Sequence, residues 1–124
     1  MRAMLKTCKG SCHCGAVRFE ADIDLAKGAG KCNCSMCTKA RAWSVNISPK
    51  DFRLFTDENA LFCRTCGIHS FSRGHVKEIG GDYVGVQLAC LDNAMPQELI
   101  DAPVTYRDGR HDNWQNIPPE TRHL

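Results

Sequence analysis

The run Cys32-Asn33-Cys34-Ser35-Met36-Cys37 brings three thiols together in one short segment. Two further cysteine groups lie on either side of it, Cys12-His13-Cys14-Gly15 and Cys63-Arg64-Thr65-Cys66-Gly67. A C-x-x-C turn presents two thiolates to one tetrahedral metal ion, and a following glycine such as Gly67 can take the left-handed backbone conformation that tightens the turn. This grouping therefore predicts metal sites, and we expect zinc in them.

Four of these cysteines form two pairs that can close one site. We assign this closed site to four residues: Cys12, Cys14, Cys63 and Cys66. A tetrahedral set of four thiolates leaves no open position, which is typical of a structural zinc ion. We therefore expect this site to stabilise the fold.

The remaining triplet, Cys32, Cys34 and Cys37, supplies only three ligands. A zinc ion bound by three protein ligands keeps a fourth position for water, a substrate thiolate or a carbonyl oxygen. The triplet is therefore our candidate catalytic site, with a purely structural role as the other interpretation. Spacing alone leaves the pairing open, because His69 or His75 could complete the triplet instead.

Disulfides and an iron–sulfur cluster are the alternatives to zinc. The chain has nine cysteines, so an all-disulfide scheme would leave one thiol without a partner. An iron–sulfur cluster would need the triplet and one remote cysteine. Outside the three groups, we expect Cys8 to be a free surface thiol and Cys90, which lies in an apolar run, to be a small core residue rather than a ligand.

The start of the chain and its charge bear on compartment and partners. Cys8-Lys9-Gly10 interrupts the apolar stretch that a signal peptide needs, and no later segment approaches the roughly 18 apolar residues of a membrane span. We therefore expect a cytoplasmic protein whose thiols stay reduced and available to metals. Seven thiolates on two Zn²⁺ ions would lower the formal charge of +2 to about −1, so charge does not favour a nucleic-acid partner.

The rest of the sequence predicts one mainly β domain over residues 1–124, with few or no helices. We expect its core at about 8–117 and a flexible tail at 118–124, because Pro118-Pro119 ends the regular pattern.

Short antiparallel strands are expected where apolar and polar residues alternate, as Val17 and Phe19 do with their charged neighbours. Six strands are predicted, at 17–20, 43–47, 52–55, 68–71, 83–90 and 104–106. Gly28 and Gly30 are interpreted as breaks between strands. Single helical turns are expected after Cys37 and at 97–100.

These cysteine groups and their neighbours resemble the glutathione-dependent formaldehyde-activating enzymes, a family that also includes centromere protein V. The resemblance covers nearly the whole chain and rests on five segments: 10–17, 32–37, 62–69, 90–92 and 108–111. It implies a β-tent, a small zinc-bound fold of mainly antiparallel sheet. It also implies a structural zinc on the four-cysteine site and a catalytic zinc on the triplet.

The activity implied by the resemblance is the addition of glutathione to formaldehyde, formally a carbon–sulfur lyase reaction in reverse. Three thiolates around Zn²⁺ leave a net charge of −1, which favours holding the substrate thiolate over generating hydroxide. Two other functions fit the same residues: a protein-interaction module with two structural zinc ions, or a thiolate-based sensor of redox state or zinc.

Several polar side chains are candidates for assisting the reaction. Acid–base help could come from His13, His69, His75, His111 or Asp92. The two carboxylates of glutathione could be steered by Lys39, Arg41 or Arg73.

The sequence departs from the resembled family in one segment. Its members usually carry one or two further strands between the part that corresponds to 51–61 and the knuckle at Cys63. Here Leu61 runs straight into Phe62-Cys63. The pocket wall on that side is therefore not implied by the resemblance.

Overall fold

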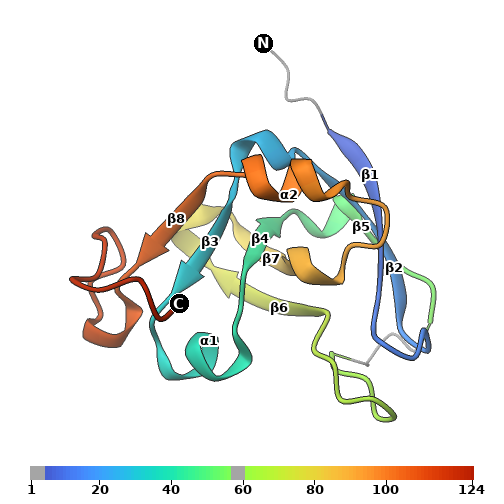
Figure 1. Ribbon diagram of the computed structural model, residues 1–124, viewed down its shortest axis with the longest axis horizontal. Helices are drawn as coiled ribbons and strands as arrows, with labels where there is room; N and C mark the ends of the chain where they lie inside the picture. The colour runs from blue at the N-terminus through green and yellow to red at the C-terminus, as the bar shows by residue number, and fades with distance from the viewer. Residues whose placement is uncertain (1–4, 57–60) are drawn as a thin grey trace.

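Two β-sheets dominate the structure, a computed structural model that describes residues 5–56 and 61–124 (Figure 1). The smaller, antiparallel sheet has the order β1-β2-β5, with strands β1 (Lys6–Ser11), β2 (Arg18–Ile23) and β5 (Phe52–Leu54). The larger sheet has the order β6-β7-β4-β3-β8, with strands β6 (Phe71–Val76), β7 (Gly81–Gln87), β4 (Ser44–Ile47), β3 (Ala29–Cys32) and β8 (Val104–Arg107). The prediction of a mainly β fold is confirmed.

Helices are short and lie at the ends of strands. The two α-helices are α1 (Ser35–Ala40) and α2 (Pro96–Asp101). Five 3-10 turns connect other elements: Leu25–Lys27, Pro49–Asp51, Lys77–Ile79, Leu88–Cys90 and Gly109–His111. In the described part of the chain, no helix combines the length and apolarity needed to cross a membrane.

Several strands differ from the sequence prediction. The sequence predicts neither β1 nor β3, and it treats Gly30 as a break. β3 forms because β4 pairs with it on one side and β8 on the other. The β3–β8 pair is parallel, whereas only antiparallel pairs are expected from the sequence. The strand expected at 68–71 instead begins at Phe71 and runs to Val76.

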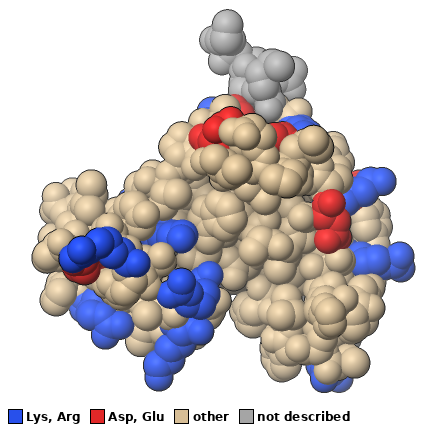
Figure 2. Space-filling view, in the orientation of Figure 1, with Lys and Arg blue, Asp and Glu red and all other residues tan. Residues whose placement is uncertain are grey.

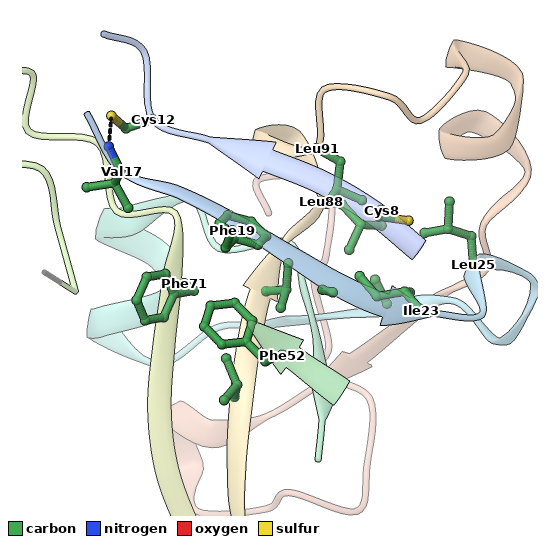
Figure 3. Close-up of a cluster of buried hydrophobic side chains, with 14 of the residues drawn as sticks. Cys8, Cys12, Val17, Phe19, Ile23, Leu25, Phe52, Phe71, Leu88 and Leu91 are labelled. Atoms are coloured by element: carbon green, nitrogen blue, oxygen red, sulfur yellow. Dashed lines mark hydrogen bonds between the residues drawn. The ribbon is translucent and has the colours of Figure 1, made fainter. Parts of the chain in front are cut away.

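The hydrophobic core lies between the two sheets. Figure 3 shows Phe19 of β2 and Phe52 of β5 facing Phe71 of β6, with ring centroids 4.8 to 6.1 Å apart. Val84 and Val86 of β7 are fully buried against this cluster. Apolar side chains of both sheets therefore meet at one interface.

Cys8 is part of this core, so the prediction of a free surface thiol is wrong. It lies on the inward face of β1 and has no exposed surface. Burial raises the pKa of its thiol. Cys8 is thus a small core residue, the role that the sequence predicted for Cys90. Cys90 itself is only half-buried, at the end of the Leu88–Cys90 turn.

The C-terminal segment, expected to be a flexible tail, lies against the region of α1. The guanidinium of Arg41 donates to the carbonyl of His123 at 2.7 Å, and the ammonium of Lys31 donates to the carbonyl of Leu124 at 3.3 Å. Pro118 is buried. The segment thus covers one side of the loop that carries the cysteine triplet.

The larger sheet has one apolar and one polar face. Because Val84 and Val86 of β7 face the core, Tyr83, Gly85 and Gln87 point to the opposite side. The neighbouring strands keep this alternation through their register, which places the polar Ser72 and Asn46 opposite Gly85. The face of the larger sheet that points away from the core therefore carries polar side chains that can contact a ligand.

Candidate metal sites and an adjoining cavity

The four-cysteine group joins two loops that are distant in the sequence. Cys12 and Cys14 lie between β1 and β2, and Cys63 and Cys66 lie in the loop that precedes β6. All four sulfur atoms lie within 4.8 Å of one another, and the Sγ atoms of Cys14 and Cys63 are 3.5 Å apart. The structure thus brings together the four residues that the sequence assigned to the closed site.

Backbone amides favour the thiolate form of two sulfurs of this group, those of Cys63 and Cys66. Gly67 has a φ of 77°, the left-handed conformation predicted for the knuckle. The N–H groups of Cys66 and Thr65 lower the pKa of Cys63. The N–H groups of Ile68 and Cys14 lower the pKa of Cys66 to about 6. Amides directed at the sulfurs favour thiolates, the form that binds metal.

The three-cysteine group lies where β3 runs into α1. Cys32 ends β3, Cys34 caps the N-terminus of α1, and Cys37 lies within its first turn. Their sulfur atoms also lie within 4.8 Å of one another. The N–H of Cys37 donates to the sulfur of Cys34 at 3.4 Å, so the helix start itself holds the second and third cysteines together.

Cys34 and Cys37 differ in how readily their thiols ionise. Burial, followed by the neighbouring Cys34, raises the pKa of Cys37 to about 12. Burial also opposes ionisation of Cys34, but the N–H of Cys37 and the neighbouring thiols outweigh it and lower the pKa of Cys34. Cys34 therefore ionises more readily than Cys37.

A buried polar network fixes the loop between Cys32 and Cys34. Asn33 is 5% exposed and donates through Nδ2 to the carboxylate of Asp108 at 2.8 Å. The backbone N–H of Arg110 donates to the side-chain oxygen of Asn33 at 2.9 Å, and the Nε of Arg110 donates to the backbone carbonyl of Asn33 at 3.0 Å. His111 bonds the same carboxylate through Nδ1 at 2.8 Å. The segment 108–111 thus positions the metal-site loop.

A cavity of about 590 Å³ adjoins the three-cysteine group and not the four-cysteine group. Its floor is the polar face of the larger sheet, and α1 forms one wall. Figure 2 shows the surface hollowed between the lobe that carries α1 and the loop of residues 61–70. The residues that line the cavity are Lys27, Gly28, Ala29, Gly30, Lys31, Cys32, Met36, Cys37, Ala40, Ala42, Ser44, Val45, Asn46, His69, Phe71, Ser72, Tyr83, Gly85, Gln87, Thr105, Arg107 and Trp114.

A smaller cavity of about 130 Å³ borders the same loop. Cys32 and Cys37 line it together with His123 and Leu124 of the C-terminal segment. The three-cysteine group therefore borders two cavities, and the C-terminal segment lines the smaller one.

Comparison with solved structures identifies a relative of this chain. No family model matches the chain. A crystal structure of a Rhodobacter sphaeroides protein, solved as a structural-genomics target, is similar with a TM-score of 0.60 and 31% sequence identity. The match covers 78% of this chain and 99% of the other. This chain belongs to the same family as that Rhodobacter protein. The family relationship supports the observed fold and carries no information about activity.

The histidines suggested as catalytic residues lie in different places. His69 lines the cavity, next to Phe62, on whose ring it stacks. His75 pairs with Asp82 at the end of the β6–β7 hairpin, with an Nδ1 to Oδ1 distance of 2.7 Å. Neither joins the three cysteines in the metal-ligand groups of the described residues, so the expected alternative of a histidine-completed triplet is not supported.

The remaining acid–base candidates lie outside the cavity lining. Asp92 accepts a hydrogen bond from the hydroxyl of Ser11 at 2.6 Å and stabilises the start of the β1–β2 connection. His13 is exposed in that connection, and His111 is held by Asp108. Of these three, none lines the cavity.

The cations expected to steer a substrate also lie elsewhere. Arg73 stacks over Phe52 and Phe71, with its guanidinium carbon 5.5 Å from the Phe71 ring centroid. Arg41 contacts the C-terminal segment, and Lys39 does not line the cavity. The cations at the cavity are instead Lys27, Lys31 and Arg107, which sequence reasoning missed. The alternation in β8 places Arg107 on the cavity face, but only the register with β3 brings it to Cys32.

The pocket wall that the resemblance left undefined is only partly visible. Residues 57–60 lie outside the described residues, and Leu61 and Phe62 are exposed at the edge of the described loop. His69 and Phe71 form the nearest described part of that wall.

Proposed function

We propose that this protein is a zinc-dependent enzyme of the carbon–sulfur lyase type. It would join a thiol such as glutathione to formaldehyde or a related aldehyde at Cys32, Cys34 and Cys37. One observation carries the proposal: Cys32 and Cys37 border a cavity of about 590 Å³, whereas no cysteine of the four-cysteine group does. A site that served only to stabilise the fold would need no such cavity.

The donor sets fit two zinc ions with different roles. Four sulfurs that lie within 4.8 Å of one another match a closed tetrahedral site on Cys12, Cys14, Cys63 and Cys66. Three equally close sulfurs match a site with one open position. Zinc bound there would supply a position at which a substrate thiol is held as its thiolate.

The proposed reaction balances without any further reactant. The thiol sulfur forms a bond to the carbonyl carbon, the carbon–oxygen π bond opens, and the proton of the thiol ends on the new hydroxyl oxygen. The cavity would hold both reactants next to Cys32 and Cys37, which line it. His69 is the histidine in the described cavity wall, and we propose it as the group that would carry the proton between sulfur and oxygen.

Other chain features support small-molecule chemistry over protein interaction. The polar face of the larger sheet directs Ser44, Asn46 and Tyr83 into the cavity. Hydrogen-bonding groups that converge on a concave space beside a candidate metal site are typical of a small-molecule site.

The experiment that tests the proposal follows adduct formation between glutathione and ¹³C-formaldehyde by NMR exchange measurements. The zinc-loaded protein should accelerate exchange between free and thiol-bound formaldehyde. Cys34→Ser should abolish the acceleration and retain the zinc of the four-cysteine site. Cys90→Ser is the matched control, because Cys90 lies outside both cysteine groups, and it should behave as the wild type. Unchanged acceleration by Cys34→Ser, or none by the wild type, would contradict the proposal.

A further inference from the structure

Arg107 lies beside the three-cysteine group through strand pairing. β3 and β8 are parallel neighbours, and their register places Cys32 directly opposite Arg107. The preceding pair on the same face is Gly30 and Thr105, and all four residues line the cavity. The sheet therefore presents a guanidinium on the cavity face at the position next to a metal-site sulfur.

Apart from its cysteines, the charged side chains in the described lining of the cavity are cations. Its described lining contains Lys27, Lys31 and Arg107 but no Asp or Glu. Figure 2 shows that Lys and Arg side chains gather on the lobe that carries α1 and the C-terminal segment. A concave site that is lined by positive charges attracts anionic ligands.

Of the three cavity cations, Arg107 is the one that lies next to a cysteine of the three-cysteine group and forms no ion pair with a described carboxylate. The ammonium of Lys31 donates to Leu124 and lies 5.9 Å from the centroid of the Trp43 ring, on the side of the smaller cavity. Lys27 lies before β3, at the end of that strand opposite to Cys32. Arg107 makes one hydrogen bond, from Nη1 to the carbonyl of Trp114 at 3.3 Å, and has no ion pair among the described residues.

Arg107 is the arginine in the described lining of the cavity, whereas the ion-paired arginines among the described residues lie elsewhere. Arg53 is engaged by Asp22 and Glu20, and Arg122 by Glu120. An arginine whose remaining N–H groups face a cavity has donors in the planar fork that matches a carboxylate.

We propose that Arg107 is a specificity-determining residue that binds a carboxylate of the substrate thiol, so that the site selects carboxylate-bearing thiols over neutral thiols of the same size. This inference rests on the proposed function of the three-cysteine site. The polar sheet face, through Asn46, Tyr83 and Gln87, would contact the uncharged part of the same ligand. The thiol itself would face Cys32 and Cys37.

A matched pair of ligands tests the inference. N-acetylcysteine and its amide have nearly the same size and the same thiol but differ in the carboxylate. Calorimetric titration of the zinc-loaded wild type should give about tenfold tighter binding of the acid, the ratio expected for one charge-assisted hydrogen-bonded pair. Arg107→Gln should reduce the ratio to about one and change binding of the amide less than about twofold.

Lys50→Gln is the matched control. It removes the same charge from an exposed turn that does not line the cavity, and it should keep the wild-type ratio. An equal affinity of the wild type for both ligands, or an unchanged preference in Arg107→Gln, would overturn the inference, as would no binding of either ligand.

The two proposals can fail separately. If the wild type prefers the acid and Arg107→Gln loses this preference, but no adduct formation is accelerated, Arg107 binds carboxylates at a site with another reaction. If adducts of the acid and the amide form with equal efficiency, the proposed reaction stands and the role of Arg107 is wrong.

Discussion

Gly109→Ala probes how the segment 108–111 supports the three-cysteine site. A β-carbon at position 109 would lie 2.6 Å from the sulfur of Cys32 and 2.5 Å from Cη2 of Trp114. Ordinary contacts between such atoms lie near 3.5–4.0 Å, so each pair must separate by about 1 Å. Trp114 is 47% exposed and can turn away. Strand pairing with Arg107 holds the backbone of Cys32, so either the sulfur of Cys32 must shift or the segment 108–111 must move away from it.

The size of the effect follows from the cost of overpacking. An added methyl group that forces its neighbours apart costs about 1–3 kcal/mol. If this cost falls on the metal-bound form, the affinity of the three-cysteine site for zinc decreases about fivefold to 150-fold, because about 1.4 kcal/mol corresponds to a factor of ten. The four-cysteine site is bordered by other loops and should keep its affinity.

Competition with a chromogenic chelator measures both sites in one titration. The wild type should release zinc in two steps, and Gly109→Ala should shift only the weaker step. Gly30→Ala is the control, since its β-carbon would meet nothing closer than the carbonyl of Thr105 at 3.6 Å, and both steps should match the wild type. Unshifted release by Gly109→Ala, or a shift of the tighter step instead, would refute the reasoning.

Three further predictions test the fold, the surface charges and the division of labour between the metal sites. Phe71→Ala removes a ring that is 1% exposed and lies 4.8 Å from the Phe52 ring. The free energy of unfolding of the zinc-saturated protein, measured in urea, should therefore fall by about 3–5 kcal/mol. A decrease of less than about 1 kcal/mol would contradict a core position for Phe71. The hydrogen bond from Lys6 to Glu98 raises the pKa of Lys6 above its ordinary value of 10.5. The contribution of this pair to the stability of the fold is therefore complete below pH 10.5 and is lost as the pH rises through the pKa of Lys6 in the folded protein. The difference in melting temperature between wild type and Glu98→Gln should therefore narrow above pH 10.5, and a constant difference would argue against the pair. Cys63→Ser should remove the zinc of the four-cysteine site and abolish the cooperative melting transition. Elemental analysis of the wild type should find about two zinc ions per chain, and a value near one would contradict the two-site account.

Sequence spacing was sufficient to predict both cysteine groups. Metal ligands must converge on one point, and the C-x-C and C-x-x-C runs bring most of them together locally. Only the joining of Cys12 and Cys14 to Cys63 and Cys66 depends on tertiary structure. The same local reasoning failed for Cys8, because its burial depends on the pairing of β1 with β2 and not on its distance from the start of the chain.

The rest of the site depends on contacts that spacing does not encode. Gly30 reads as a break, yet its backbone is paired on both sides in β3, where neighbouring strands outweigh a weak local preference. Arg107 is distant from Cys32 in the sequence and reaches it only through the parallel β3–β8 register. Asn33 and Asp108 likewise form their hydrogen bond only once that pair exists. The sequence therefore predicts the two cysteine groups but not the cavity or its charge.

Zinc K-edge X-ray absorption on the protein loaded with two zinc ions per chain tests most directly whether the three-cysteine site holds a substrate thiol. Without thiol, the spectrum should fit about 3.5 sulfur atoms per zinc, the mean of four and three, with a lighter scatterer on half of the ions. Saturation with glutathione should raise this mean to about four and remove the lighter scatterer. A spectrum that already fits four sulfur atoms, or one that glutathione leaves unchanged, would contradict an open, thiol-binding site at Cys32, Cys34 and Cys37.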